Sequence, residues 1–316
     1  MPTAGAGGPA RGGPVTFRCA AASLARADDL AGTASTVRSF LLVEHSGSWG
    51  SDALRDARLP AGLGEHLARG GRRAGVRVLL VRRPGRRAEG VGIRVFAARA
   101  AGADSWLEAA TLSSPEELRD LDLDALGAGR SPGLTPYDAP LIAVCTHGRH
   151  DACCAERGRP VALALAAGRH ADAVWECSHI GGDRFAGNLL VLPRGLYYGR
   201  VDPDSALEVA DAAVGGRVSL DHLRGRSDLA MPVQAAEIDV RRRLTLTGLD
   251  DVRPTAARTD GDVTTVTLEA DGRSLEVRVR RVLDAPQQLT CSALRDSPVA
   301  RFVVDARDRG PSPAGP

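Results

Sequence analysis

The sequence predicts a mixed α/β protein in which the order β-α-β-β-α occurs twice and a small β-rich module follows. Three observations support this. The chain has 316 residues, enough for about two domains of ordinary size. Apolar runs of strand length alternate with segments of helical spacing. A stretch rich in proline and glycine, 127–140, separates the first set of elements from the second.

The first half, residues 15–135, contains four apolar runs of strand length and two segments of helical character. The segment 50–71 between the first two runs has helical spacing and ends in a glycine pair. A second helix is expected over 114–126, where Ser114 and Glu117 can form a capping box. The expected strands are 37–45, 76–83, 92–100 and 105–112.

The second half, residues 136–232, repeats this order. A hairpin is expected around the turn Pro193-Arg194-Gly195, because apolar runs flank it on both sides. Strand and helix alternation that ends in a hairpin is the thioredoxin-like pattern, so we expect two thioredoxin-like halves. The other expected elements are strands 140–145 and 171–179, a helix 159–168 that starts at a proline, and a helix 204–216.

The remaining chain, 233–308, is expected to form a helix and a β-rich module. A helix over 233–244 precedes strands at 263–270, 275–282 and 299–304, and Asp271-Gly272 is a hairpin signal between the first two strands. The ends, 1–14 and 309–316, are rich in proline and glycine and are expected to be disordered. Residues 1–14 also lack the apolar core of a secretory signal, so we expect a cytoplasmic protein.

The charge balance excludes some function classes. All 41 basic residues are arginine and 39 residues are acidic, a net charge of +2 that gives no reason to propose nucleic acid as a partner. No apolar run approaches the roughly 18 residues that a membrane span needs. Because arginine is so abundant, we give single arginines little weight as functional signals.

The rare residues gather in one window. Four of six cysteines and four of seven histidines lie within 145–179. In a reducing compartment, clustered cysteines indicate metal binding or catalysis rather than disulfides. Cys145 ends one expected strand and Cys177 lies near the end of another, and such strand ends meet at one rim of an α/β sheet. Thiolate and imidazole ligands suit zinc or an iron–sulfur cluster and do not suit magnesium or calcium.

Two segments make the sequence similar to a known family. CTHGRHDACCAERGRPVA (145–162) and WECSHIGGDRFAGNLLVLPRGLYYGRV (175–201) resemble the sucrase/ferredoxin-like family of thioredoxin-like [2Fe–2S] proteins. The resemblance extends over about 35–240 and implies Cys145, Cys154 and His179 as cluster ligands. Asp183 stands where fungal relatives have a second histidine. We expect Cys177 as the fourth ligand, with Asp183 and Cys153 as alternatives.

Other residues near these motifs have open roles. We expect His147, Gly181, Gly182 and Arg184 to surround the ligands, where the glycines permit tight turns. His147 and His150 either donate hydrogen bonds toward the cluster or are solvated loop residues. Glu44, His45 and Trp49, at the end of the first strand, serve either docking of a partner or packing against the second half. Cys19 and Cys291 are isolated in sequence, and structural roles are expected for both.

The sequence therefore favours a [2Fe–2S] protein acting in one-electron transfer or redox sensing, a redox carrier rather than an enzyme with its own substrate. No G-x-G-x-x-G segment follows a strand and opens a helix, so a separate reductase or electron acceptor is the expected partner. Two alternatives remain. One is a binding or scaffold protein with a structural Cys3His zinc site, and the other is a hydrolase, as the family label hints.

Overall fold

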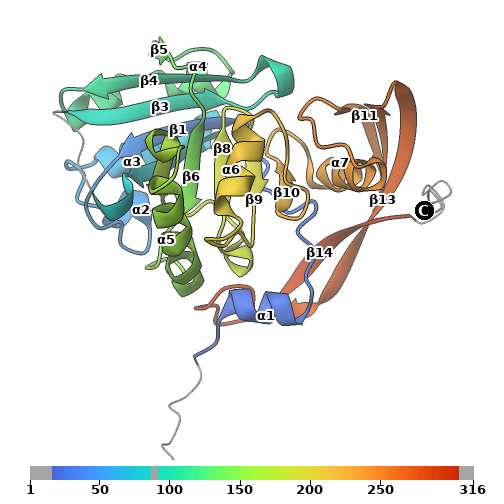
Figure 1. Ribbon diagram of the computed structural model, residues 1–316. Helices are drawn as coiled ribbons and strands as arrows, with labels where there is room; N and C mark the ends of the chain where they lie inside the picture. The colour runs from blue at the N-terminus through green and yellow to red at the C-terminus, as the bar shows by residue number, and fades with distance from the viewer. Residues whose placement is uncertain (1–15, 87–91, 306–316) are drawn as a thin grey trace, which may run out of the picture.

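The largest unit of the computed structural model, which describes residues 16–86 and 92–305, is a ten-stranded mixed sheet (Figure 1). Its strand order is β10-β9-β8-β6-β7-β2-β1-β3-β4-β5. A four-stranded antiparallel sheet, β11-β12-β13-β14, forms a second unit. The mixed α/β class predicted from the sequence is therefore confirmed. The expected disordered ends, 1–14 and 309–316, lie outside the described residues.

The first half contributes β1 to β5 to the large sheet. Apolar residues fill β1 (Ser39–Glu44) and β2 (Val76–Arg82), which pair in parallel through the crossover helix α3 (Leu63–Ala74). The remaining elements are short or amphipathic: α2 (Ala53–Asp56), η1 (Pro84–Arg86), β3 (Ile93–Arg99), η2 (Gly102–Asp104), β4 (Trp106–Leu112) and β5 (Thr135–Pro136).

One expected helix of this half is split. Residues 114–126 form η3 (Pro115–Arg119) and, after a turn, α4 (Leu123–Gly127), instead of one continuous helix. The Glu117 side chain does accept a hydrogen bond from the Ser114 amide, as a capping box requires. The break arises because Asp122 caps a new helix by accepting from the amide of Ala125.

The second half repeats the element order of the first, which is β-α-β-β-β-α and thus has one strand more than the expected β-α-β-β-α. Its crossover helix, α5, spans Ala152–Ala166 and not 159–168 as expected. The start differs because the Asp151 side chain caps the helix by accepting from the Cys153 amide, and Pro160 lies inside the helix. The other elements are β6 (Leu141–Cys145), η4 (Ala171–Ala173), β7 (Val174–Cys177), η5 (Asp183–Phe185), β8 (Leu189–Leu192), β9 (Leu196–Tyr198), α6 (Ala206–Val214) and β10 (Leu223–Arg226).

The two halves have the same strand order and share one core. Parallel β1 and β2 with antiparallel β3 and β4 correspond to parallel β6 and β7 with antiparallel β8 and β9. The halves join where β2 pairs with β7, through Val81 opposite Cys177 and Arg82 opposite Glu176. Side chains from one face of both halves form a common hydrophobic cluster, in which the rings of Phe96 and Trp175 are 5.4 Å apart.

The helices cover the other face of each half sheet. α3 and α4 bury one cluster against the first half, and α5 and α6 bury another against the second half. Each helix thus fixes the loop that follows or precedes it at the end of the strands. Across the described residues, no helix is both long and apolar enough to cross a membrane.

The C-terminal unit is a helix packed on a twisted antiparallel sheet. α7 (Met231–Leu244) buries its apolar face on β11 (Val252–Asp260), β12 (Val263–Ala270), β13 (Arg273–Gln287) and β14 (Ser297–Val304). Asp271 and Gly272 both have positive φ, as the hairpin signal predicts. β13 and β14 extend as a long hairpin from the C-terminal unit toward α1 (Cys19–Ala25) (Figure 1).

Candidate functional site

Three ligand atoms predicted from the sequence converge at the end of the second half. The Sγ atoms of Cys145 and Cys154 and a ring nitrogen of His179 all lie within 4.8 Å of one another, and we call these residues the Cys/Cys/His group. Cys145 ends β6, Cys154 lies in the first turn of α5, and His179 follows β7 by two residues. Because β6 and β7 are parallel neighbours, their ends and the start of α5 meet at one rim.

Asp183 lies beside this group. Its Oδ1 atom is 2.9 Å from His179 Nδ1 and accepts a hydrogen bond from Cys154 Sγ at 3.1 Å. The Asp183 carboxylate is buried, whereas the His179 side chain is 28% exposed. His179 Nδ1 is itself shielded from solvent and makes no well-directed hydrogen bond. The group is therefore buried on its thiol and carboxylate side and open on its imidazole side.

Charges within the group are strongly coupled. The adjacent Cys154 thiol and the contact with His179 lower the pKa of Cys145 well below its usual value. The adjacent Cys145 sulfur, together with burial, raises the pKa of Cys154. Burial alone would lower the pKa of His179, but Asp183 and Cys145 raise it to about 9. A metal binds deprotonated thiolate and neutral imidazole, so the raised pKa values of His179 and Cys154 oppose metal binding as the pH falls.

The two other cysteines of the motif are not members of the Cys/Cys/His group, although Cys177 is the β7 register partner of Cys145. Cys177 is fully buried in the core shared by the two halves, and its thiol is in none of the clustered sets of ligand atoms found among the described residues. Cys153 neighbours Cys154 on α5 but contacts Cys19 and Cys291 instead. Cys19 and Cys291, isolated in sequence, are thus brought together by the fold.

The first half covers one side of the group. His147 Nδ1 accepts from the His179 amide at 3.2 Å, and His147 Nε2 lies 2.9 Å from the Gly50 carbonyl. The Trp49 ring packs edge-on against His147. Of the two roles left open for the segment that contains Trp49, packing against the second half is the one observed. The His147 side chain therefore positions the backbone of His179.

His150 lies on the open side. Its ring stacks on that of His179 with centroids 3.8 Å apart, and its side chain is 37% exposed. The His150 Nε2 atom is 3.8 Å from Asp183 Oδ2. The two imidazoles thus form the solvent-facing edge of the group.

The Gly181-Gly182 turn is held by a buried arginine. Both glycines have positive φ, and a Cβ on Gly182 would lie 2.3 Å from the Arg224 guanidinium. Arg224 donates to the Gly181 carbonyl and to Asn188 Oδ1, both at 2.9 Å. Arg224 was not identified from the sequence, because single arginines carry little weight in a chain so rich in arginine. Its only sequence signal was its place within the region that resembles the family.

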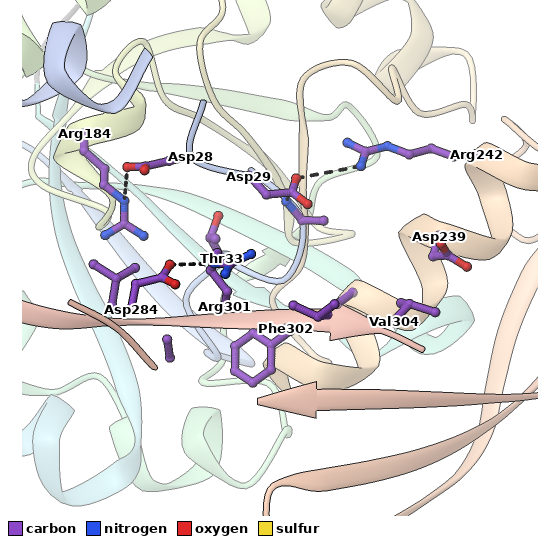
Figure 2. Close-up of a pocket in the computed structure, with 15 residues that line it drawn as sticks. Asp28, Asp29, Thr33, Arg184, Asp239, Arg242, Asp284, Arg301, Phe302 and Val304 are labelled. Atoms are coloured by element: carbon purple, nitrogen blue, oxygen red, sulfur yellow. Dashed lines mark hydrogen bonds and ion pairs between the residues drawn. The ribbon is translucent and has the colours of Figure 1, made fainter. Parts of the chain in front are cut away.

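Arg184 points away from the Cys/Cys/His group. Figure 2 shows it beside Asp28 in a cavity between the N-terminal segment, α7 and β14. The cavity has a volume of about 230 Å³, and six of the charged side chains that line it form three ion pairs. The pairs are Arg184 with Asp28 at 3.6 Å, Arg242 with Asp29 at 3.8 Å, and Arg301 with Asp284 at 2.5 Å.

Comparison with known proteins identifies the family. Neither curated proteins nor solved structures yield a match to this chain. A family model described as sucrase/ferredoxin-like matches residues 30–225, which include both halves of the large sheet and every residue of the Cys/Cys/His group. The chain belongs to the sucrase/ferredoxin-like family.

Proposed function

We propose that the chain carries one [2Fe–2S] cluster held by Cys145, Cys154, His179 and Asp183, and that it acts in one-electron transfer or redox sensing. The observation that carries the proposal is the convergence of two buried thiols and a partly exposed imidazole at one rim of the sheet. Such soft and borderline donors suit iron–sulfur clusters and zinc. The family's ferredoxin-like description favours the cluster.

Asp183 is a better fourth ligand than Cys177. Asp183 Oδ1 lies within 3.1 Å of atoms of both Cys154 and His179. Cys177 shares a hydrophobic cluster with Cys145 but is 0% exposed and belongs to the packed core. The Asp183 carboxylate is also the polar group beside His179 Nδ1, a buried atom that makes no well-directed hydrogen bond.

The chain's own residues would orient and insulate the site. His147 holds the backbone of His179, and Arg224 holds the Gly181-Gly182 turn between His179 and Asp183. Imidazole ligation in place of thiolate raises the potential of a [2Fe–2S] centre. The partly exposed His179 and His150 rings are the natural contact point for a separate reductase or electron acceptor.

Two further parts of the proposal concern fold and location. We infer that each half is thioredoxin-like, because parallel β1 and β2 with antiparallel β3 and β4 correspond to β6 to β9. A cytoplasmic location fits six free cysteines, since thiols persist in a reducing compartment.

The test is a metal and spectral analysis of the full chain. Protein purified anaerobically should be red-brown and contain iron and acid-labile sulfide. Cys154→Ser should lose both colour and iron, because it removes a ligand. Cys177→Ala, the matched control at a neighbouring buried thiol, should keep them. Loss of colour with Cys177→Ala and retention with an Asp183→Ala variant would instead make Cys177 the fourth ligand.

A structural zinc site is the second candidate. The three ligand atoms lie within 4.8 Å of one another, a compact arrangement that suits a single ion. Colourless protein that binds zinc at the Cys/Cys/His group and takes up no iron or sulfide, even on anaerobic reconstitution, would establish zinc and overturn the cluster. Two buried carboxylates near the Cys/Cys/His group do not support a hydrolase. Glu176 is paired with Arg82 at 2.8 Å, and Asp183 is engaged by His179 and Cys154.

A further inference from the structure

We propose a second metal site, for zinc, formed by Cys19, Cys153, Cys291 and Asp151. These residues come from three segments far apart in the sequence: α1, the start of α5 and the connection between β13 and β14. One ligand atom from each lies within 4.8 Å of all the others. This second group shares no residue with the Cys/Cys/His group.

The spacing of the ligand atoms fits a tetrahedral zinc ion. With Zn–S bonds of about 2.3 Å, a tetrahedral site places its sulfur atoms about 3.8 Å apart and a sulfur and a carboxylate oxygen about 3.5 Å apart. The Sγ atom of Cys291 is 3.4 Å from that of Cys153 and 3.6 Å from that of Cys19. The Cys19 Sγ atom is 3.5 Å from Asp151 Oδ1. Small adjustments would thus admit the ion.

The carboxylate is fixed in place by the backbone of the other ligand residues. Asp151 Oδ1 accepts from the Cys153 amide at 2.9 Å, and Asp151 Oδ2 accepts from the Cys291 amide at 2.6 Å. Each oxygen keeps a lone pair for a metal. Metal-ligating carboxylates are commonly oriented by such hydrogen bonds.

The surroundings suit a closed structural site. Cys19, Asp151 and Cys153 are at most 2% exposed, and Cys291 is half-buried. Three thiolates and one carboxylate around Zn²⁺ carry a formal net charge of −2. Arg18 and Arg184 lie close enough to these sulfur atoms for their charges to interact, so cationic groups are at hand to offset that charge.

Zinc bound by these four residues would cross-link the C-terminal unit to the large sheet unit. The ion would tie the β13–β14 hairpin and α1 to the first turn of α5 as three thiols release their protons to solvent. On that turn, Cys153 of the proposed zinc site is followed directly by Cys154 of the Cys/Cys/His group. The second site would therefore also steady the helix that presents Cys154.

The test is zinc stoichiometry of the full chain, measured by elemental analysis after incubation with zinc under reducing conditions. The wild-type chain should hold one more zinc equivalent than Cys291→Ser and Cys19→Ser, and Asp151→Asn should bind zinc about 10- to 100-fold more weakly. Cys177→Ala, which removes a thiol outside both groups, should keep the full zinc content. Equal zinc content in wild type and Cys291→Ser would overturn the proposal.

A second measurement does not depend on the variants folding. In wild-type protein, zinc should protect Cys19, Cys153 and Cys291 together from alkylation, and a chelator should expose all three, as mapped by mass spectrometry. Alkylation of these thiols at the same rate with and without zinc would overturn the site. A Cys153–Cys291 disulfide in protein kept under reductant would do so as well.

Discussion

Replacing Arg224 with methionine should destabilise the large sheet unit and loosen the proposed cluster site. Arg224 is fully buried and donates four hydrogen bonds, to the Thr33 hydroxyl and carbonyl, the Gly181 carbonyl and Asn188 Oδ1. Four acceptors left without a donor cost about 6 kcal/mol at roughly 1.5 kcal/mol each. Methionine fills similar space but restores none of these bonds.

Part of this cost is offset because methionine carries no charge. Burial lowers the pKa of Arg224 to about 10, a change that corresponds to about 3 kcal/mol against the charged form. The expected loss in free energy of unfolding is the difference, about 3 kcal/mol. Urea unfolding followed by tryptophan fluorescence measures it in the relevant unit, because Trp49, Trp106 and Trp175 all lie in the two halves of the large sheet.

A matched arginine provides the control. Arg253 pairs with Glu269 on the second sheet, and its side chain is 68% exposed. Arg253→Met should change stability by less than about 1 kcal/mol, because exposed ion pairs contribute little. If Arg224→Met also changed stability by less than about 1 kcal/mol and kept full iron content, the buried arginine would not be the support that we infer.

Three further substitutions test other parts of the fold. Gly182→Ala places a Cβ 2.3 Å from a guanidinium nitrogen of Arg224, at a φ of +82°. It should lower the free energy of unfolding by about 3 kcal/mol and reduce iron content. The control Gly75→Ala lies at a positive φ in open space and should cost only about 1 kcal/mol in the same urea titration. Arg82→Met leaves its buried carboxylate partner without the paired charge and should cost about 3 to 5 kcal/mol by urea unfolding; a change under about 1 kcal/mol would refute that role. Leu268→Ala leaves a cavity in the core under α7 and should lower the free energy of unfolding of the C-terminal unit by about 3 kcal/mol. Amide hydrogen exchange in β12 should become faster, and unchanged exchange would refute this role of Leu268.

Local patterns predicted most strands of this protein. The runs that became β1, β2, β6 and β12 are apolar or alternate with period two, and burial of one or both faces enforces the same register in the fold. The Asp271-Gly272 turn was predictable because the positive φ angles of these two residues depend on the residue types themselves. β11 was not predicted, because most of its side chains are exposed and it contains Pro254, which an edge strand tolerates.

The site was predictable where its signal was a spacing of rare residues. The window of clustered cysteines and histidines predicted a site, the family resemblance implied Cys145, Cys154 and His179 as its ligands, and the fold brings their ligand atoms together. The start of α5 was predicted wrongly because Pro160 outweighed the capping signal of Asp151. The approach of Cys19 to Cys291 spans 272 residues along the chain and depends on where the β13–β14 hairpin docks, which no local pattern specifies.

The first half contains only one cysteine, Cys19, yet it contributes to the Cys/Cys/His group from the other side of the β2–β7 junction. Arg82, on β2, pairs with Glu176 of β7 and lies over the Trp49 ring at 4.1 Å. Trp49 in turn packs on His147, which holds the His179 backbone. This chain of contacts excludes water from one side of the group and leaves the His150 and His179 rings open on the other. A half without ligands in the group thus leaves the edge formed by the His150 and His179 rings as its solvent-facing side.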